Sequence, residues 1–170
     1  FRLTLQLAGA TTLTLLVLGL PLAAWLAGTR SRWRYLVEAL VALPLVLPPT
    51  VLGFYLLWGL GPQSPLGRVW KSLTGSALTF TFGGMLVASV LYNLPFAVRP
   101  FTSALAAVDR RVIEAAWCLG TSPVATLLRV TIPLAWRGIL TGLILTFAHT
   151  VGEFGVILMV GGNIPGVTRT

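Results

Sequence analysis

The chain has 170 residues, of which 56% are hydrophobic and 9% are charged, and its formal net charge is +8. A soluble domain usually has about a quarter of its residues charged, so this composition excludes a water-soluble globular domain and predicts that lipid is the solvent. A single cysteine, Cys118, and a single histidine exclude an intrachain disulfide and an ordinary structural metal site.

Apolar runs of about 20 residues predict helices that cross a membrane. Such runs cover residues 3–28, 36–60, 78–98 and 134–160, so we expect an all-α integral membrane protein folded as a multi-span helical bundle. The first run is longer than the roughly 7–15-residue core of a signal peptide, so we expect it to be retained. The chain begins at Phe1 rather than Met, and we interpret residues 1–170 as one transmembrane domain cut from a longer protein.

Lys and Arg residues are divided unequally between the two sides of the predicted bundle. Connections on one side carry Arg30, Arg32, Arg34, Arg99, Arg110, Arg111, Arg129 and Arg137, and the other side carries Arg2, Arg68, Lys71 and Arg169. Because cytoplasmic connections carry the excess of positive charge, we expect the larger group to face the cytoplasm. This dispersed pattern also argues against nucleic-acid binding.

The second apolar run contains Pro44, Pro48 and Pro49. Proline removes a backbone donor and clashes with the preceding turn, so this helix must kink or open. Carbonyl groups freed in a bilayer are tolerated only against protein or a water-filled cavity. Two interpretations remain open, a kink that improves packing or a broken segment, marked by Pro48 and Pro49, that lines a transport path.

The connection 109–133 interrupts the apolar pattern. Asp109 is a candidate N-cap for a short helix over about 110–119, which Gly120 would end in the left-handed conformation. Ser122 and Pro123 are typical of the start of a second helix. Neither helix is long and apolar enough to cross a membrane, so we expect a cytoplasmic helical hairpin.

The first helix of this hairpin places Ile113, Ala116 and Trp117 at helical spacing on one face, with Glu114 and Ala115 elsewhere. One interpretation is an amphipathic helix on the lipid surface. Such helices are usually rich in Lys and Arg along their polar face. Glutamate and small alanines fit a contact with another protein better.

Polar residues inside the predicted spans are candidates for function because they are costly in lipid. His149 and Glu153 are four residues apart and share a helix face, and Asn93 lies in the third span. Each of these three residues could either hold neighbouring helices together or line a transport pathway, and both alternatives remain open. We expect nearby glycines, Gly152, Gly155, Gly161 and Gly162, to permit close helix approach or a break.

The hairpin resembles the cytoplasmic EAA loop of the permease subunits of ABC importers. The resemblance rests on Glu114-Ala115-Ala116, on Gly120 after three further residues, and on Val130-x-Ile132-Pro133 nine residues later. The family pattern ends in Ile-x-Leu-Pro, so Val130 and Ile132 are conservative departures. The resemblance implies a type I ABC importer permease fold with a coupling-helix hairpin, in which Glu114, Ala115, Ala116, Gly120 and Ser122 contact a separate ATPase subunit.

Further stretches resemble the molybdate and tungstate permease subunits, namely residues 43–57, 64–70 and 147–170, and Gly152-Glu153-Phe154-Gly155 is also similar to sulfate permeases. This implies a permease for a tetrahedral oxyanion, with molybdate the expected substrate and tungstate or sulfate the alternatives. Pro48, Pro49, Asn93, His149 and Glu153 are then candidates for the pathway or its gate. A carboxylate repels an oxyanion, so we expect a structural or gating role for Glu153.

The resemblance implies a non-enzymatic transport subunit without a cofactor of its own. The sequence has no GxxxxGK[ST] motif, so ATP and Mg²⁺ are expected on the partner ATPase. The other implied partners are an external oxyanion-binding protein, expected at the loop 161–166, a second copy of the chain in a homodimer, and the lipid bilayer. The implied location is the inner (cytoplasmic) membrane of a prokaryotic-type cell, with several spans.

Two other classes of function were compared with this interpretation. An intramembrane hydrolase could use Ser89 as nucleophile and His149 as base, but no glycine-flanked serine motif supports it. A transporter driven by an ion gradient typically has inverted repeats, which the four predicted spans do not show.

Overall fold

The computed structural model describes residues 2–164 and residue 168, and every regular element in this part of the chain is helical. This confirms the all-α fold class. The helices are α1 (Arg2–Gly28), α2 (Trp33–Val46), α3 (Pro49–Leu60), α4 (Pro65–Thr74), α5 (Phe82–Ala106), α6 (Arg110–Cys118), α7 (Pro123–Thr126), the π-helical η1 (Leu127–Thr131), α8 (Ile132–Gly152) and α9 (Gly155–Gly161).

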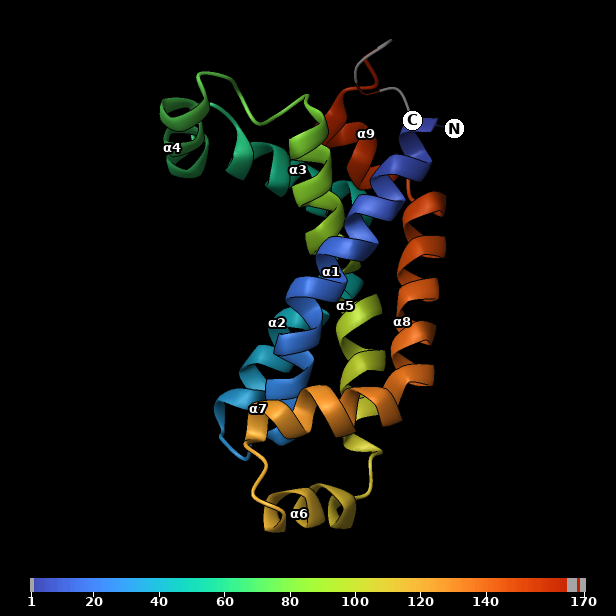
Figure 1. The fold of residues 1–170 in the computed structure, drawn as a ribbon. Helices are drawn as coiled ribbons and strands as arrows, with labels where there is room; N and C mark the ends of the chain where they lie inside the picture. Colours follow the sequence, from blue (N-terminus) through green and yellow to red (C-terminus); the bar gives the residue numbers. More distant parts are fainter. Residues whose placement is uncertain (1, 165–167, 169–170) are drawn as a thin grey trace.

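The centre of the molecule is a bundle of α1, α5 and α8, with α2 against α5 (Figure 1). In the described residues, three continuous helices are long and apolar enough to cross a membrane, Arg2–Gly28, Phe82–Ala106 and Pro123–Gly152. These three helices pack together around a buried apolar core that includes Leu15, Phe101 and Ile139. The third predicted span, 78–98, begins and ends later in the structure, because Thr81 caps α5 and the helix continues through Pro95 and Pro100.

Two glycines on α8 allow it to approach α5 closely. A Cβ atom at Gly138 would lie 2.4 Å from the Ala104 Cβ, and one at Gly142 would lie 2.7 Å from Phe101 Cε1. Gly138 and Gly142 form a G-x-x-x-G spacing, which places both on one helix face. This motif was not among the sequence-based predictions, although its spacing is visible in the sequence.

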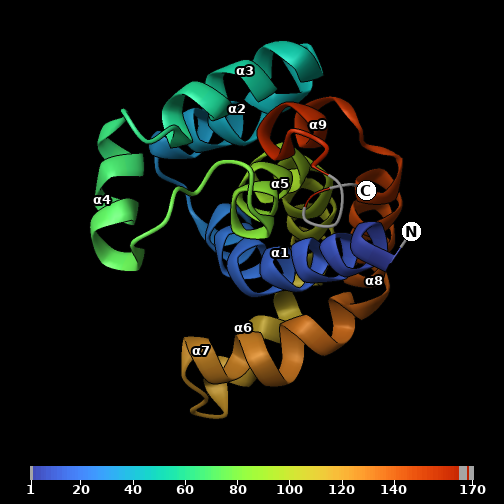
Figure 2. The ribbon, with the colours of Figure 1, turned by 90° about the horizontal axis from the view of Figure 1, so that it is seen from above.

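The second predicted span is bent by 112° where α2 ends and α3 begins. Pro44 is accommodated inside α2, whereas Leu47 and Pro48 have extended ψ angles of 134° and 140°. Each of these two residues precedes a proline, which disfavours the helical conformation. The double proline therefore turns the chain, and α3 runs across the end of the bundle beside α9 (Figure 2).

The structure divides the fourth predicted span, 134–160, into two helices. α8 ends at Gly152, Glu153 is extended with ψ 121°, and α9 begins at Gly155. Gly155 permits this arrangement because a Cβ atom there would lie 2.8 Å from the Pro49 Cβ. Hydropathy alone could not reveal the break, since both helices are apolar.

The connection between the second and third predicted spans contains a further helix, α4. Ser64 accepts a hydrogen bond from Gly67 N, Pro65 occupies the first turn, and Gly75 ends the helix with φ 74°. These are ordinary start and stop residues, so the sequence contained the signals of a helix that was not among the predicted elements.

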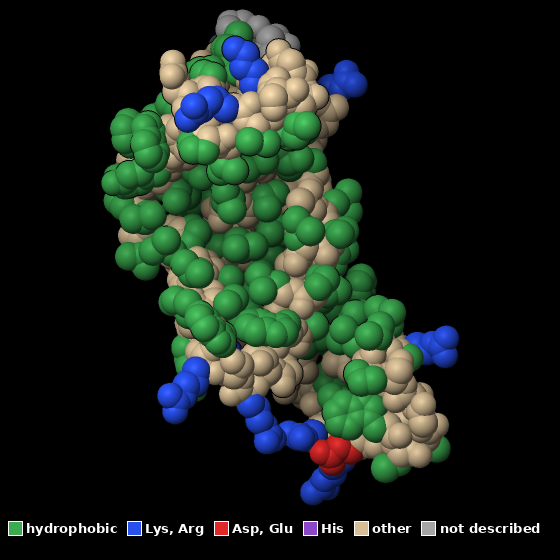
Figure 3. Space-filling model, turned by 90° about the vertical axis from the view of Figure 1, so that its left-hand side faces the viewer, with side chains coloured by type: hydrophobic (Ala, Val, Ile, Leu, Met, Phe, Trp, Pro, Cys, Tyr) green, Lys and Arg blue, Asp and Glu red, His purple; other side chains and the backbone are tan. Residues whose placement is uncertain are grey.

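Lys and Arg side chains gather at the two ends of the molecule, and a hydrophobic band separates them (Figure 3). The end with α6 and α7 corresponds to the larger predicted group of basic residues, and α4, α9 and the start of α1 lie at the opposite end (Figure 1). Arg169 of the smaller group, and Pro165 and Gly166 of the 161–166 loop, lie outside the described residues.

Candidate functional site

The helical hairpin forms as the sequence predicts and lies beyond the end of the bundle (Figure 1). Asp109 accepts a hydrogen bond from Arg111 N at 2.9 Å at the start of α6. Gly120 has φ 81°, the left-handed conformation that ends the helix. Ser122 then caps α7 by accepting from Ala125 N at 3.3 Å.

Two threonines fix the turn between α6 and α7. The Thr121 hydroxyl donates to Ala116 O at 2.6 Å and lies 2.8 Å from the Thr126 hydroxyl. Thr126 is buried and donates to Ser122 O at 3.0 Å. The hairpin is therefore held by side-chain hydrogen bonds at its turn as well as by its caps. Sequence reasoning missed both threonines, because the Thr121–Thr126 contact depends on the turn geometry.

The two faces of α6 differ as expected. Ala116 is buried, whereas Glu114 and Ala115 are exposed. The Glu114 carboxylate accepts from Arg110 Nε at 2.8 Å, one turn earlier on the same exposed face. Leu119 is 85% exposed at the tip of the hairpin. A carboxylate, a small residue and an apolar residue are thus available to a partner protein.

A groove of about 600 Å³ separates the hairpin from the end of α1. Its lining is mainly apolar, with Ile113 and Trp117 from α6 and Pro21 and Trp25 from α1. The hairpin therefore contacts the bundle through its second helix more than through α6.

The second helix of the hairpin continues without interruption into α8. α7, η1 and α8 together form a 30-residue helix, Pro123–Gly152. Its π-helical part contains Arg129 and is followed by Pro133 in the first turn of α8. The hairpin is therefore joined directly to α8, which carries His149 in its last turn and is followed by Glu153.

A second group of polar residues lies inside the bundle. His149 Nδ1 is 2.9 Å from Asn93 Oδ1, and Asn93 Nδ2 donates to Ser89 O at 2.9 Å. Because the Asn93 amide nitrogen donates to a carbonyl, the Asn93 amide oxygen is the atom that faces His149. An amide oxygen can only accept, so His149 Nδ1 is the donor and carries the proton. Thr11 on α1 completes the group by donating to Ser89 Oγ at 3.0 Å. The group connects α1, α5 and α8, and Phe96 stacks on the His149 ring at 3.8 Å between centroids.

This geometry does not support the hydrolase alternative. Ser89 is fully buried, and its hydroxyl is bonded to Thr11 and Asn93. The His149 nitrogen that is hydrogen-bonded contacts Asn93 instead of Ser89. A serine nucleophile requires a base within hydrogen-bond reach and access for a substrate.

Glu153 occupies the break between α8 and α9. Its Oε1 accepts from Val156 N at 3.0 Å, so the side chain caps the start of α9. Its Oε2 is buried and has no hydrogen-bond partner among the described residues. Glu153 is only 8% exposed, and the hydrogen bond that its side chain forms holds the start of α9.

A cavity of about 480 Å³ brings most of the predicted pathway residues together. Pro49, Tyr92, His149 and Glu153 line it, together with Thr50, Gly152, Phe154 and Gly155. Asn93 lies behind His149 through their hydrogen bond. Pro48 is not among the lining residues and instead sets the turn into α3. The assignment of these residues to a pathway stays a prediction.

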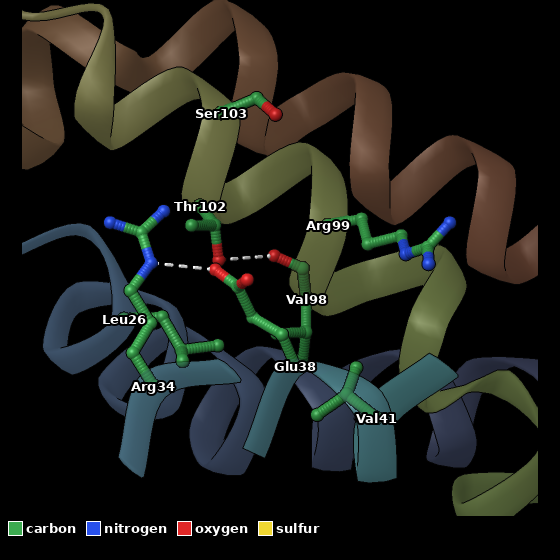
Figure 4. Close-up of a pocket in the computed structure, with 8 residues that line it drawn as sticks. All are labelled: Leu26, Arg34, Glu38, Val41, Val98, Arg99, Thr102 and Ser103. Carbon is green, nitrogen blue, oxygen red and sulfur yellow. Dashed lines mark hydrogen bonds and ion pairs between the residues drawn. The ribbon is translucent and has the colours of Figure 1, made fainter. Parts of the chain in front are cut away.

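A second pocket, of about 290 Å³, opens at the end of the bundle near the hairpin. Arg34 and Glu38 of α2 line it opposite Arg99, Thr102 and Ser103 of α5 (Figure 4). Arg34 Nε donates to Glu38 Oε1 at 2.7 Å, and Thr102 donates to Val98 O. The sequence analysis used these arginines only as topology signals.

Comparison with known proteins identifies relatives along the whole chain. The family described as "Binding-protein-dependent transport system inner membrane component" matches residues 19–170. The molybdenum transport system permease protein ModB of Azotobacter vinelandii is 56% identical over 169 residues, which cover 99% of this chain and 75% of the relative.

Two more distant relatives come from Haloferax volcanii and Bacillus subtilis. A probable molybdenum ABC transporter permease protein of Haloferax volcanii is 45% identical over 152 residues, covering 89% of this chain and 55% of the relative. A putative molybdenum transport system permease protein of Bacillus subtilis is 34% identical over 168 residues, covering 99% and 74%.

Proposed function

Because the chain belongs to the family of binding-protein-dependent transport system inner membrane components, we propose that it is the permease subunit of an ATP-driven importer for molybdate. The observation that carries the proposal is the helical hairpin, whose first helix, around Glu114, lies clear of the bundle and whose second helix continues directly into a membrane-crossing helix. The relatives named as molybdenum transport permeases support the choice of substrate. Tungstate and sulfate are the alternative tetrahedral oxyanions.

In this proposal the hairpin faces the cytoplasm and binds a separate ATPase subunit, which holds ATP and Mg²⁺. Glu114, Ala115 and Leu119 form the exposed contact surface, and Gly120 and Ser122 set its shape. Closure of the ATPases on ATP binding would displace the hairpin. The chain itself performs no chemistry.

The long helix from Pro123 to Gly152 would carry that displacement across the membrane. α7 and η1 run across the end of the bundle and α8 runs along it (Figure 1), and the 21 residues of α8 extend about 32 Å at 1.5 Å per residue, close to the roughly 30 Å hydrocarbon core. Its far end adjoins the cavity lined by His149 and Glu153. Movement of α8 against α3 and α9 would thus open or close this cavity.

The cavity suits a gate better than a tight binding site. A permease must desolvate an anion and release it again, so weak contacts are sufficient. Glu153 has one carboxylate oxygen bound to Val156 N, which supports a role in holding α9. The selectivity would then lie mainly in an external binding protein that delivers the oxyanion.

The other components of the proposed importer are a second permease copy, related by two-fold symmetry, and two ATPase copies. The assembly would lie in the cytoplasmic membrane with the hairpin inside. The larger number of Lys and Arg residues at the hairpin end supports this orientation.

The test is uptake of labelled molybdate into proteoliposomes that contain the full-length permease, its ATPase and the binding protein. We expect uptake that requires ATP and that unlabelled tungstate inhibits more strongly than sulfate. Uptake without ATP, driven by an imposed ion gradient, would contradict the proposal. Competition by sulfate at equal strength would replace molybdate by sulfate as the substrate.

A further inference from the structure

The ten-residue helix α4 has an apolar face that the rest of the structure leaves uncovered. Leu66, Val69, Trp70 and Leu73 follow i, i+3, i+4 and i+7 spacing and therefore share one side of the helix. They are 68%, 59%, 40% and 78% exposed. Exposed large apolar side chains on one continuous face indicate a surface that another apolar phase covers.

Basic residues occupy the opposite side of the same helix. Arg68 and Lys71 are exposed, and neither has an acidic partner within 4.0 Å among the described residues. The helix thus separates a purely apolar side from a side with two cations. This division is typical of helices that lie in a membrane interface, with the cations near the phosphate groups.

The start of α4 is fixed relative to the bundle. Ser64 caps the helix, and a Cβ atom on Gly67 would overlap Gly61 O in the preceding turn. The helix packs against α3, which itself follows the sharp bend after α2. The direction of the apolar face is therefore set by the fold.

α4 lies at the level where a membrane surface is expected. It extends sideways at the end opposite the hairpin (Figure 1), and the view along the bundle shows it lengthwise, across the bundle axis (Figure 2). Its neighbour α3 exposes Tyr55 and Trp58, 58% and 75%. The two neighbouring helices thus expose Tyr55, Trp58 and Trp70, and Tyr and Trp side chains are enriched at membrane–water interfaces.

We propose that α4 is an interfacial helix that lies in the outer leaflet, with Leu66, Val69, Trp70 and Leu73 among the acyl chains and Arg68 and Lys71 beside the lipid phosphates. The partner of this face is lipid rather than a second copy or a binding protein. The choice of lipid rests on the two cations of α4 and on the exposed aromatic residues of the adjacent helix α3. α4 would then hold α3, and with it Pro49 at the cavity, at a fixed depth.

Spin labels on single cysteines test this assignment, and the chain offers a clean background because Cys118 is its only cysteine. The full-length permease with Cys118→Ser, without its ATPase so that the hairpin tip stays in water, would be placed in nanodiscs of phosphatidylcholine and phosphatidylglycerol. Labels are introduced by Leu66→Cys, Val69→Cys and Leu73→Cys, and on the other side by Arg68→Cys and Ser72→Cys. Collision with lipid-soluble oxygen and with a water-soluble nickel chelate is measured for each.

Two further positions calibrate the scale. Val17, 67% exposed in the middle of α1, is the lipid reference, and Leu119 at the hairpin tip is the water reference. We expect the oxygen-to-nickel ratio at positions 66, 69 and 73 to approach that of Val17 and to exceed that at 68 and 72 several-fold. A ratio near that of Leu119 at all five positions would overturn the proposal by placing α4 in water.

Protection from both reagents at positions 66, 69 and 73 would also overturn it, because protein would then cover the apolar face. Repeating the measurement with the external binding protein present, and with doubly labelled dimers, would identify which protein covers it. All labelled positions are already exposed, so the labels do not disturb the packed core.

Discussion

At the residue scale, hydrogen bonds between side chains join the three central helices. Thr11, Ser89, Asn93 and His149 form one connected group, and Asn93 is completely buried within it. Each of these residues is polar in an apolar stretch, so the sequence could mark Asn93 and His149 as candidates. Their pairing could not be predicted, because 56 positions separate them along the chain.

Asn93→Leu tests the contribution of this group to stability. The substitution removes the bonds to Ser89 within α5 and the interhelical bond to His149, and an interhelical hydrogen bond in a membrane protein contributes about 0.6 to 1.7 kcal/mol. We expect a lower thermal unfolding midpoint of the purified permease in detergent. Thr12→Val is the control, since the Thr12 hydroxyl bonds only to Ala8 O in its own helix. Equal midpoints for both variants would show that the group does not connect the helices.

Two substitutions of Glu153 separate a structural role of its side chain from an electrostatic one. Glu153→Gln keeps an oxygen that accepts from Val156 N, whereas Glu153→Ala removes it. Loss of a capping side chain costs about 0.5–2 kcal/mol, so we expect the Ala variant to be less stable and the Gln variant to retain uptake. Molybdate uptake and unfolding are measured together. A folded Gln variant without uptake would show that the charge itself is required.

Breaks and close contacts between helices determine the architecture at the element scale. Pro48 and Pro49 predicted a kink or a break in the second span, but the 112° angle and the neighbours of α3 depend on tertiary packing. The hairpin was predictable in detail, because Asp109, Gly120 and Ser122 act locally. Gly152 was predicted to permit either close helix approach or a break, and the sequence could not decide between them because apolar residues continue on both sides.

Gly142→Ala tests the close packing of α8 on α5. The added methyl group would meet Phe101 at 2.7 Å and Pro100 at 3.3 Å. Overpacking of this kind costs about 1–3 kcal/mol, so we expect a measurable loss of stability in chemical or thermal unfolding. Gly9→Ala on α1 is the matched control, because nothing lies within 4 Å of its added methyl group. A Gly142 variant as stable as the Gly9 variant would contradict the packing described for these helices.

The hairpin and the cavity lie at opposite ends of one helix at the scale of the whole molecule. Charge composition correctly predicted that Lys and Arg gather at two ends, and the resemblance of residues 114–133 to the EAA loop correctly predicted the family. The interfacial orientation proposed for α4 required the structure, because it depends on where its apolar face points. In this account, movement of the hairpin displaces α8 and thereby opens or closes the cavity at the far end of that helix.

Glu114→Gln tests the contact with the ATPase. A hydrogen bond to a charged group contributes about 1.5–3 kcal/mol, so its loss should weaken ATPase binding roughly ten- to hundred-fold. Binding and molybdate-stimulated ATP hydrolysis are measured. Glu38→Gln is a matched control, because Glu38 forms the same i, i+4 ion pair with an arginine but lies outside the hairpin. A loss of equal size in both variants would reflect general electrostatics rather than a contact of Glu114.

The most direct measurement is a crosslink from the hairpin tip in whole membranes. With Cys118→Ser as background, Leu119→Cys places a single thiol on a side chain that is 85% exposed. We predict a crosslinked product that contains the ATPase subunit, and protection of the thiol from a membrane-impermeant maleimide added outside intact cells. Labelling from outside, or crosslinks only to lipid, would contradict the assignment of this hairpin as the site that couples ATP hydrolysis to transport.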